Sequence, residues 1–193
     1  LRDDVIQPMI NASMVYARSG DSTNAYALLE KALTVEPESA MVNFNLALLD
    51  AEFEQFGKAE THLRTALKSE PEMAQAAYNL GVLLAREDHP EGLQWLEKAA
   101  LLIPENWNYI SSYLYFLDKA GRSSETESVL IRMIGTGHAA PQTYFLLAGN
   151  YEKEGRTADA LEIYKKAKLN QNLSMDAKRY AAQMEQRLRS AQQ

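Results

Sequence analysis

Histidine is the side chain best suited to acid–base catalysis or metal binding near neutral pH, and this chain has three. His62, His89 and His138 are separated by 27 and 49 residues, so no two of them fall on one helical face at the spacing of a metal motif. We expect His62 on the outward side of a helix and the other two in turns, as solvated or capping groups. The histidines therefore indicate neither a metal site nor a catalytic base.

The other residue types that could do chemistry lead to the same conclusion. The densest glycine cluster, Gly135-Thr136-Gly137-His138, lacks the strand, third glycine and following lysine of a phosphate-binding loop. Paired glutamates at 52 and 54, and at 125 and 127, stand two residues apart and face different sides of a helix. The chain has no cysteine, hence no thiol nucleophile, disulfide or thiolate metal site. We predict a protein that is not an enzyme, with no catalytic residues, cofactor or metal.

Composition narrows the class of partner. The 193 residues are 46% hydrophobic and 24% charged, as in ordinary soluble domains, and carry a formal charge of −6. An acidic chain without a basic block binds phosphate backbones and anionic membranes poorly, and no apolar run reaches the roughly 20 residues of a membrane span. We therefore expect a protein or peptide partner, no nucleic acid and no membrane insertion. The composition fits cytoplasm and periplasm equally and does not assign a compartment.

A period of about 34 residues organises the chain. Pro37, Pro71 and Pro104 each follow a helix-like stretch and lie 34 and 33 residues apart. Alignment on them gives units near 6–39, 40–73, 74–106, 107–140 and 141–173, and the third is one residue shorter because of its turn Asp88-His89-Pro90, with Pro90 expected at the start of the next helix. We predict one repeat array over residues 1–193.

Small residues recur at three positions of the unit, and helical spacings of three, four and seven connect them. The eighth position reads Ser13, Ala47, Gly81, Leu114 and Ala148; the twentieth reads Ala25, Ala59, Gly92, Thr126 and Ala160; the twenty-seventh reads Ala32, Ala66, Ala99, Met133 and Ala167. Small side chains at fixed points let two antiparallel helices approach closely. Between the two halves lie glycine stops followed by a residue expected to cap the next helix, Ser22, Ser123 or Thr157.

This pattern resembles the tetratricopeptide repeat (TPR) family. Ala77-Tyr78-Asn79-Leu80-Gly81 is similar to the core of the family's first helix, and residues 160–167 to that of its second. The resemblance covers residues 6 to about 173. It implies an all-α fold, a right-handed superhelical α-solenoid of five antiparallel helix–turn–helix units, and an interaction scaffold.

Two segments depart from the repeat. In the fourth unit Leu114, Thr126 and Met133 replace all three small residues and His138 stands in place of the closing proline, so we expect a local change in superhelical pitch near 107–140. Residues 174–190 form an amphipathic helix that Ser174 can cap and that should cover the last apolar face of the stack. Its expected apolar stripe is Ala177, Tyr180, Ala181, Met184 and Leu188, with Glu185 among the charged residues mostly off it.

In proteins similar to this one, the first helix of each unit lines a concave groove through its second, fifth, sixth and ninth positions. These twenty positions carry no charge, whereas charged residues make up 24% of the chain. Contiguous uncharged surface rich in aromatic residues and methionine favours a contact site. The predicted partner-binding residues are Gln7, Ile10, Asn11, Met14, Met41, Phe44, Asn45, Leu48, Gln75, Tyr78, Asn79, Val82, Asn108, Ser111, Tyr115, Gln142 and Phe145.

The occupant that this groove predicts is a neutral, partly apolar peptide or helix. The recurring Asn11, Asn45 and Asn79 could bind its backbone or only support the stack. A Hsp90-type carboxylate clamp, known in the family, is not expected, because Ile10 and Met14 are among the residues found where it needs cations.

Two other functional hypotheses stand beside the groove. In one, the chain is the partner-recruiting C-terminal tail of a larger multidomain enzyme or secreted protein, since it begins without Met or a polar cap ahead of Ile6. In the other, the chain forms homo-oligomers through that uncapped N-terminal face.

Overall fold

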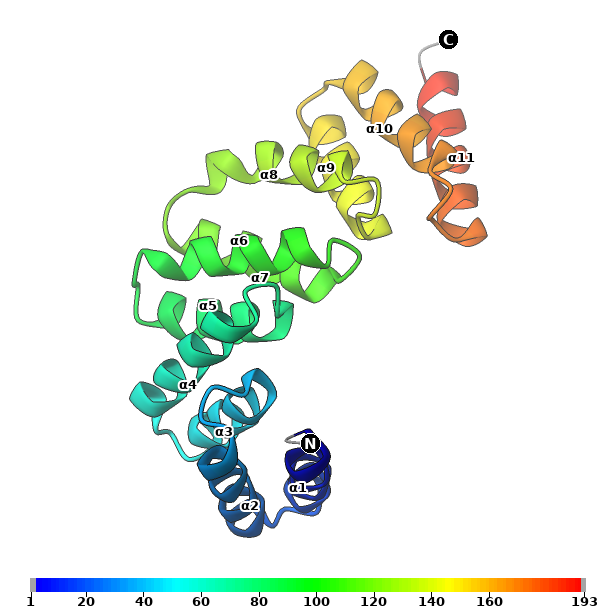
Figure 1. The fold of residues 1–193 in the computed structure, drawn as a ribbon. Coiled ribbons are helices and arrows are strands. Elements are labelled where there is room, and N and C mark those ends of the chain that lie inside the picture. The colour runs from blue at the N-terminus through cyan, green and yellow to red at the C-terminus, as the bar shows by residue number, and fades with distance from the viewer. Residues whose placement is uncertain (1–2, 192–193) are drawn as a thin grey trace. The chain divides into compact units, whose positions relative to one another are not determined.

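The computed structural model describes residues 3–191, which contain eleven α-helices, one short 3-10 helix and no strand. The chain divides into two compact units, Leu1–Trp95 and Leu96–Gln193. The helices of the first unit are α1 (Asp3–Arg18), α2 (Ser22–Val35), α3 (Ala40–Glu52), α4 (Phe56–Ser69), α5 (Ala74–Arg86) and the start of α6 (Glu91–Leu102). The second holds the rest of α6, α7 (Trp107–Lys119), η1 (Ser123–Glu125), α8 (Thr126–Gly135), α9 (Pro141–Lys153), α10 (Thr157–Leu169) and α11 (Met175–Ser190), as Figure 1 shows. The all-α solenoid class predicted from the repeat is confirmed.

Helix starts follow the period of the sequence. Four helices begin at the residue predicted to start a repeat. These helices are α3, α5, α7 and α9, which begin at Ala40, Ala74, Trp107 and Pro141. The first repeat (6–39) differs, because α1 begins at Asp3, ahead of Ile6. Among the described residues, no helix has both the length and the apolar character needed to cross a membrane.

Close packing of helix pairs explains the small residues. Ala25, Ala32, Ala59 and Ala66 are at most 1% exposed. At Gly92 a Cβ atom would lie 2.5 Å from the backbone nitrogen of Ala85, closer than atoms can approach. Around these contacts, larger side chains form the core of α1, α2 and α3, made of Ile6, Ile10, Leu29, Val42, Leu46 and Leu49 together with Ala25 and Ala32.

The fifteenth position of every unit has a left-handed backbone. Its φ is +82° at Gly20, +58° at Glu54, +57° at Asp88, +72° at Gly121 and +73° at Gly155. After each of these residues, the next backbone N–H donates to the carbonyl five residues earlier, as from Gln55 to Asp50, which closes the helix in a Schellman motif. The repeat therefore needs this conformation even in the two units that lack glycine there.

The expected serine and threonine caps are wrong by one residue. Ser22 and Thr157 are already helical, and the residue before each is the N-cap. Asp21 caps α2 by accepting from the N–H of Asn24, whereas Ser123 lies in the 3-10 turn. Likewise Pro90 directly precedes α6 and is not its first residue. The Schellman closure consumes one residue after the left-handed position, which displaces each cap.

The fourth repeat (107–140) departs from the others in its second helix. The 3-10 turn η1 precedes α8, which has only 10 residues. Met133 is fully buried where other units have alanine, while Leu114 and Thr126 are half-buried. The larger side chains thus coincide with a shortened helix, and the expected change in superhelical pitch stays a prediction.

The terminal helix α11 packs against α10. Ser174 caps it by accepting from the N–H of Ala177. Ala177 and Ala181 are buried as predicted, whereas Tyr180 of the same expected stripe is 44% exposed. Glu185 differs from the expectation, since it is only 9% exposed and its carboxylate binds Lys168 and Arg189. Two cations thus compensate the buried charge.

Candidate functional site

No constellation for catalysis or metal binding is present in residues 3–191. No group of three or more His, Asp or Glu side chains is placed to hold a metal ion there. The expectation of a solvated His62 is wrong, because its side chain is only 20% exposed. His62 Nδ1 lies 2.9 Å from Asn43 Oδ1, and its Nε2 lies 3.7 Å from Asp50 Oδ2.

These groups form a buried polar cluster between α2, α3 and α4. Tyr26 donates its hydroxyl to Asp50 Oδ1 at 3.1 Å, and Asn43 donates to the carbonyls of Pro37 and Ser39. Burial lowers the pKa of His62, an effect that the Asp50 carboxylate opposes. Asp50 is completely buried and accepts the Tyr26 hydroxyl, so the cluster is a structural element of the first compact unit and not a site open to substrate.

The predicted groove positions of the first compact unit (Leu1–Trp95) lie on the first helices of three repeats, α1, α3 and α5, and we call these positions together the first-helix face. Most of its side chains are exposed or half-buried; Ile10 is the exception. At 2% exposure Ile10 belongs to the core and takes no part in the face. The exposed members are Gln7, Asn11, Met14, Met41, Leu48 and Gln75, and the half-buried members are Phe44, Asn45, Tyr78, Asn79 and Val82.

Two hollows open on this face. One has a volume of about 250 Å³ and is lined by Met14, Ala17 and Arg18 of α1, Leu29 of α2 and Asn45, Leu48 and Leu49 of α3, with Ser13 at its base. The other, about 750 Å³, lies between α3 and the loop before α5 and is lined by Met41, Phe44, Met73, Gln75 and residues 69–72. Met14 and Leu48 are 44% and 40% exposed, so a large part of each apolar side chain is accessible to a partner.

The recurring asparagines are tied to their own helices. Asn45 donates to the carbonyl of Met41 and Asn79 to that of Gln75, each at 2.8 Å and four residues back. Asn11 accepts from Gln7 at 3.0 Å. These bonds hold the side chains flat along the helix surface, which keeps the apolar neighbours Met14 and Leu48 accessible.

In the second compact unit (Leu96–Gln193) the predicted positions differ more in exposure. Asn108 and Gln142 are exposed, Ser111 is half-buried, and Tyr115 is 64% exposed with its ring edge-on to Phe116. Phe145 packs against Tyr180 of α11, with ring centroids 4.6 Å apart. The terminal helix α11 therefore already covers Phe145, the aromatic residue that the fifth repeat (141–173) would offer to a partner.

Comparison with known proteins decides the family. Tetratricopeptide repeat models match residues 6–39, 47–108 and 141–169, well over half of the chain. The chain belongs to the tetratricopeptide repeat family. The matched ranges leave out residues 109–140, which hold the divergent fourth repeat.

Solved structures agree with this TPR assignment. Pseudomonas aeruginosa pilF is 20% identical over 97% of this chain and 93% of that one, with a TM-score of 0.61. YrrB, described as a TPR protein with an unusual peptide-binding site, is 21% identical over 91% of both chains, with a TM-score of 0.59. A Thermobaculum terrenum O-GlcNAc transferase is 25% identical over 68% of this chain but only 26% of its own, with a TM-score of 0.57. A comparison with curated proteins gave no match.

A third hollow lies in the second compact unit, lined by residues of α8, α9 and α10, and none of the predicted groove positions lines it. It has a volume of about 650 Å³ between α8 and α10. The sequence contains one sign of this hollow. Its lining residue Ile131 stands at the twenty-fifth position of the fourth repeat, where the other four repeats have a charged residue. The charged residues that line it are paired within the chain, Asp159 with Arg156 and Glu162 with Lys166, so this hollow has no unpaired charge with which to select a partner.

Proposed function

We propose that the first-helix face of α1, α3 and α5 binds a neutral, partly apolar peptide or helix of a protein partner. Tetratricopeptide repeats are protein-interaction scaffolds, and the proposal adds the location of the contact and the chemistry of the ligand. The observation that carries it is the pair of hollows lined by Met14, Leu48, Met41 and Phe44. Exposed apolar side chains that gather around concave surface bind partners by removing apolar area from water.

The absence of charge on this face sets the character of the ligand. A buried unpaired charge costs several kcal/mol. None of the face positions is itself charged, and the charged residues that line the two hollows, Arg18, Glu70 and Glu72, stand beside the face positions. Each asparagine uses one amide group within its own helix, and its remaining hydrogen-bonding groups, together with Gln75, can bond a peptide backbone. The peptide-binding site named for YrrB, a structural neighbour, is consistent with such use of the fold.

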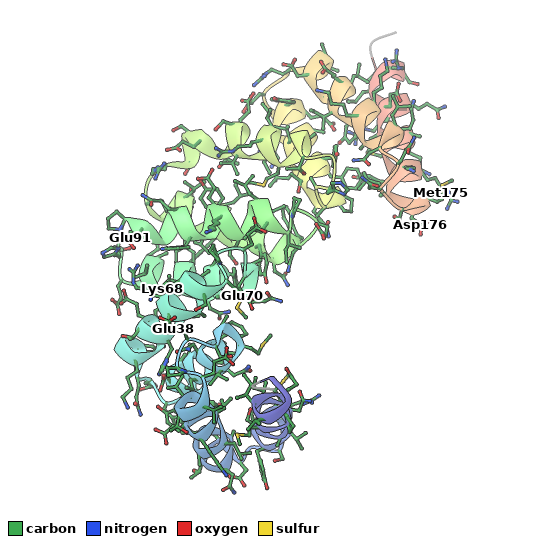
Figure 2. All side chains as sticks on the ribbon, in the orientation of Figure 1. Glu38, Lys68, Glu70, Glu91, Met175 and Asp176 are labelled. Atoms are coloured by element: carbon green, nitrogen blue, oxygen red, sulfur yellow. The ribbon has the colours of Figure 1, made fainter. Side chains whose placement is uncertain are left out.

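The decisive experiment compares two charge-introducing variants. Peptides selected from a random display library on the wild-type protein should bind the double variant Met14→Glu/Leu48→Glu at least tenfold more weakly, because each apolar side chain contributes about 1–2 kcal/mol when a partner buries it. The control is Met175→Glu in the second unit, where Met175 is 71% exposed; Figure 2 shows its place at the start of α11.

Circular dichroism must first show that all three proteins keep the same helix content. Equal binding to wild type and to the folded double variant would place the contact elsewhere and reject the first-helix face. Equal loss in Met175→Glu would point to general hydrophobic adsorption.

One further observation supports a second candidate function. The chain aligns with 26% of a much longer transferase. A repeat array attached to an enzyme recruits the partners on which that enzyme acts, and the first-helix face would then serve recruitment. The coding sequence around this chain tests that idea: an adjoining enzyme domain would support it, and a chain bounded by its own start and stop codons would reject it.

A further inference from the structure

Two loops of the first compact unit (Leu1–Trp95) share the sequence Glu-Pro-Glu. Residues 36–38 follow α2 and residues 70–72 follow α4, one repeat apart. Both loops join a second helix to the first helix of the next repeat. They allow a comparison of two nearly identical acidic loops in one protein.

In the first loop the exposed carboxylate is paired. Lys68 Nζ lies 2.7 Å from Glu38 Oε1, and Ser69 donates its hydroxyl to the Glu38 carbonyl at 2.7 Å. Lys68 holds the twenty-ninth position of its repeat, and the residue at that position in the next repeat is Leu101. The lysine that neutralises the first loop thus has no equivalent for the second.

The second loop consequently carries unpaired charge. Among the residues that the structure describes, Glu70 and Glu72 form no ion pair, and both are exposed. Figure 2 shows Glu38 and Lys68 beside each other and Glu70 apart from them. The second loop therefore presents two carboxylates that a cation from another molecule can reach.

These carboxylates border an apolar hollow. Glu70 and Glu72 line the 750 Å³ hollow together with Met41, Phe44 and Met73. Lysine and arginine side chains can lay their aliphatic stems on an apolar surface while the charged head reaches a carboxylate. The ring of Phe44 can add a cation–π contact to the same head group.

We propose that the partner segment presents one lysine or arginine, flanked by apolar residues, to this hollow, with the cation at Glu70 and Glu72 and its stem against Met41 and Phe44. The inference rests on the proposed function and changes it in one respect, because the partly apolar ligand now carries a single cation and is not neutral. The ligand is uncharged along the rest of the first-helix face and carries one cation at the loop before α5. Charge complementarity selects this ligand, because an acidic or neutral residue at the same place would leave both carboxylates without a counter-charge.

The test uses two short peptides as probes, acetyl-Leu-Arg-Leu-amide and the same peptide with uncharged citrulline in place of arginine. Methionine methyl groups labelled with ¹³C report binding by NMR, since Met41 and Met73 line the hollow and Met175 lies in the other unit. The arginine peptide should shift Met41 and Met73, leave Met175 unchanged, and bind roughly two- to fivefold more tightly than the citrulline peptide, as expected for exposed ion pairs.

A matched pair of variants locates the charge effect. Glu70→Gln/Glu72→Gln should abolish the preference for arginine, whereas Glu30→Gln/Glu54→Gln, which removes the same net charge from exposed positions of the same unit, should keep it. Equal affinity of both peptides, a preference that survives in Glu70→Gln/Glu72→Gln, or no shift at Met41 and Met73 would overturn the inference. Equal affinity with shifts at Met41 and Met73 would still leave groove binding in place, so the two proposals fail separately.

Discussion

The left-handed residue at the fifteenth position of each repeat provides a quantitative test of the fold. Glu54 adopts φ +58° although it has a Cβ atom, and its exposed side chain forms no ion pair with any other residue that the structure describes. For an L-residue this conformation costs about 1–2 kcal/mol. Glycine removes that strain but loses about 0.5–1 kcal/mol more conformational entropy on folding. We therefore expect Glu54→Gly to stabilise the protein by about 0.5–1 kcal/mol.

The backbone hydrogen bonds around this residue do not depend on its side chain. Glu54 donates its N–H to Ala51, and Gln55 donates to Asp50 at 2.7 Å, so both bonds persist in the variant. The matched control is Glu54→Ala, which removes the same charge and keeps the strain; its stability should stay within a few tenths of a kcal/mol of wild type. The reverse change, Gly155→Ala at φ +73°, should destabilise by roughly 1 kcal/mol.

Urea unfolding followed by circular dichroism at 222 nm measures the global effect, and a rise in Tm of about 1–4 °C should accompany Glu54→Gly. Repeat arrays can unfold in parts, so hydrogen exchange of peptides spanning residues 46–60 should confirm that the protection gained is local. Equal stability of Glu54→Gly and Glu54→Ala would refute the reasoning, since it would mean that the left-handed turn stores no strain.

The remaining predictions concern packing and the buried cluster. Gly92→Ala should destabilise by about 1–3 kcal/mol because its Cβ would meet the backbone of Ala85, whereas Gly149→Ala, in a helix with open space around it, should stabilise by up to about 1 kcal/mol; similar urea midpoints for the two variants would contradict the close approach. Tyr26→Phe should destabilise by about 1–3 kcal/mol by removing a hydrogen bond from buried Asp50. Burial, reinforced by Asp50, raises the pKa of Tyr26 to about 12. A raised pKa means that the folded state holds this proton more tightly than the unfolded chain, so the stabilisation is complete below pH ~10 and lost between pH ~10 and 12. Alkaline urea midpoints that fall equally in wild type and Tyr26→Phe would exclude this contribution.

Much of the helical framework could be predicted from local chemistry. Alignment on prolines spaced by 34 and 33 residues places helix starts at Ala40, Ala74, Trp107 and Pro141, because proline acts within a few residues of where it occurs. The caps were displaced from Ser22 and Thr157 because the Schellman closure depends on backbone geometry that residue types alone do not show.

The candidate site was less predictable. Offset within the repeat identified most of the first-helix face, yet it also included Ile10, which is core. A residue at the fifth position of an inner repeat and one at the same position of the first repeat have different neighbours, and only packing separates them. For the same reason only the tertiary structure shows that Lys68 pairs with Glu38 of the preceding loop and not with Glu70 or Glu72.

The sequence by itself determined the family, the period, the helices and the absence of charge along the first-helix face, since all of these are carried by residue types at regular intervals. Tertiary structure decided which of those positions remain open. In the folded protein Asp50 and Ile10 are buried, and the backbones of Glu54 and Asp88 adopt the left-handed conformation. The ring of Tyr180 packs against that of Phe145. Each of these outcomes depends on which side chains meet across helices, and that is settled only when residues far apart in the chain compete for the same space.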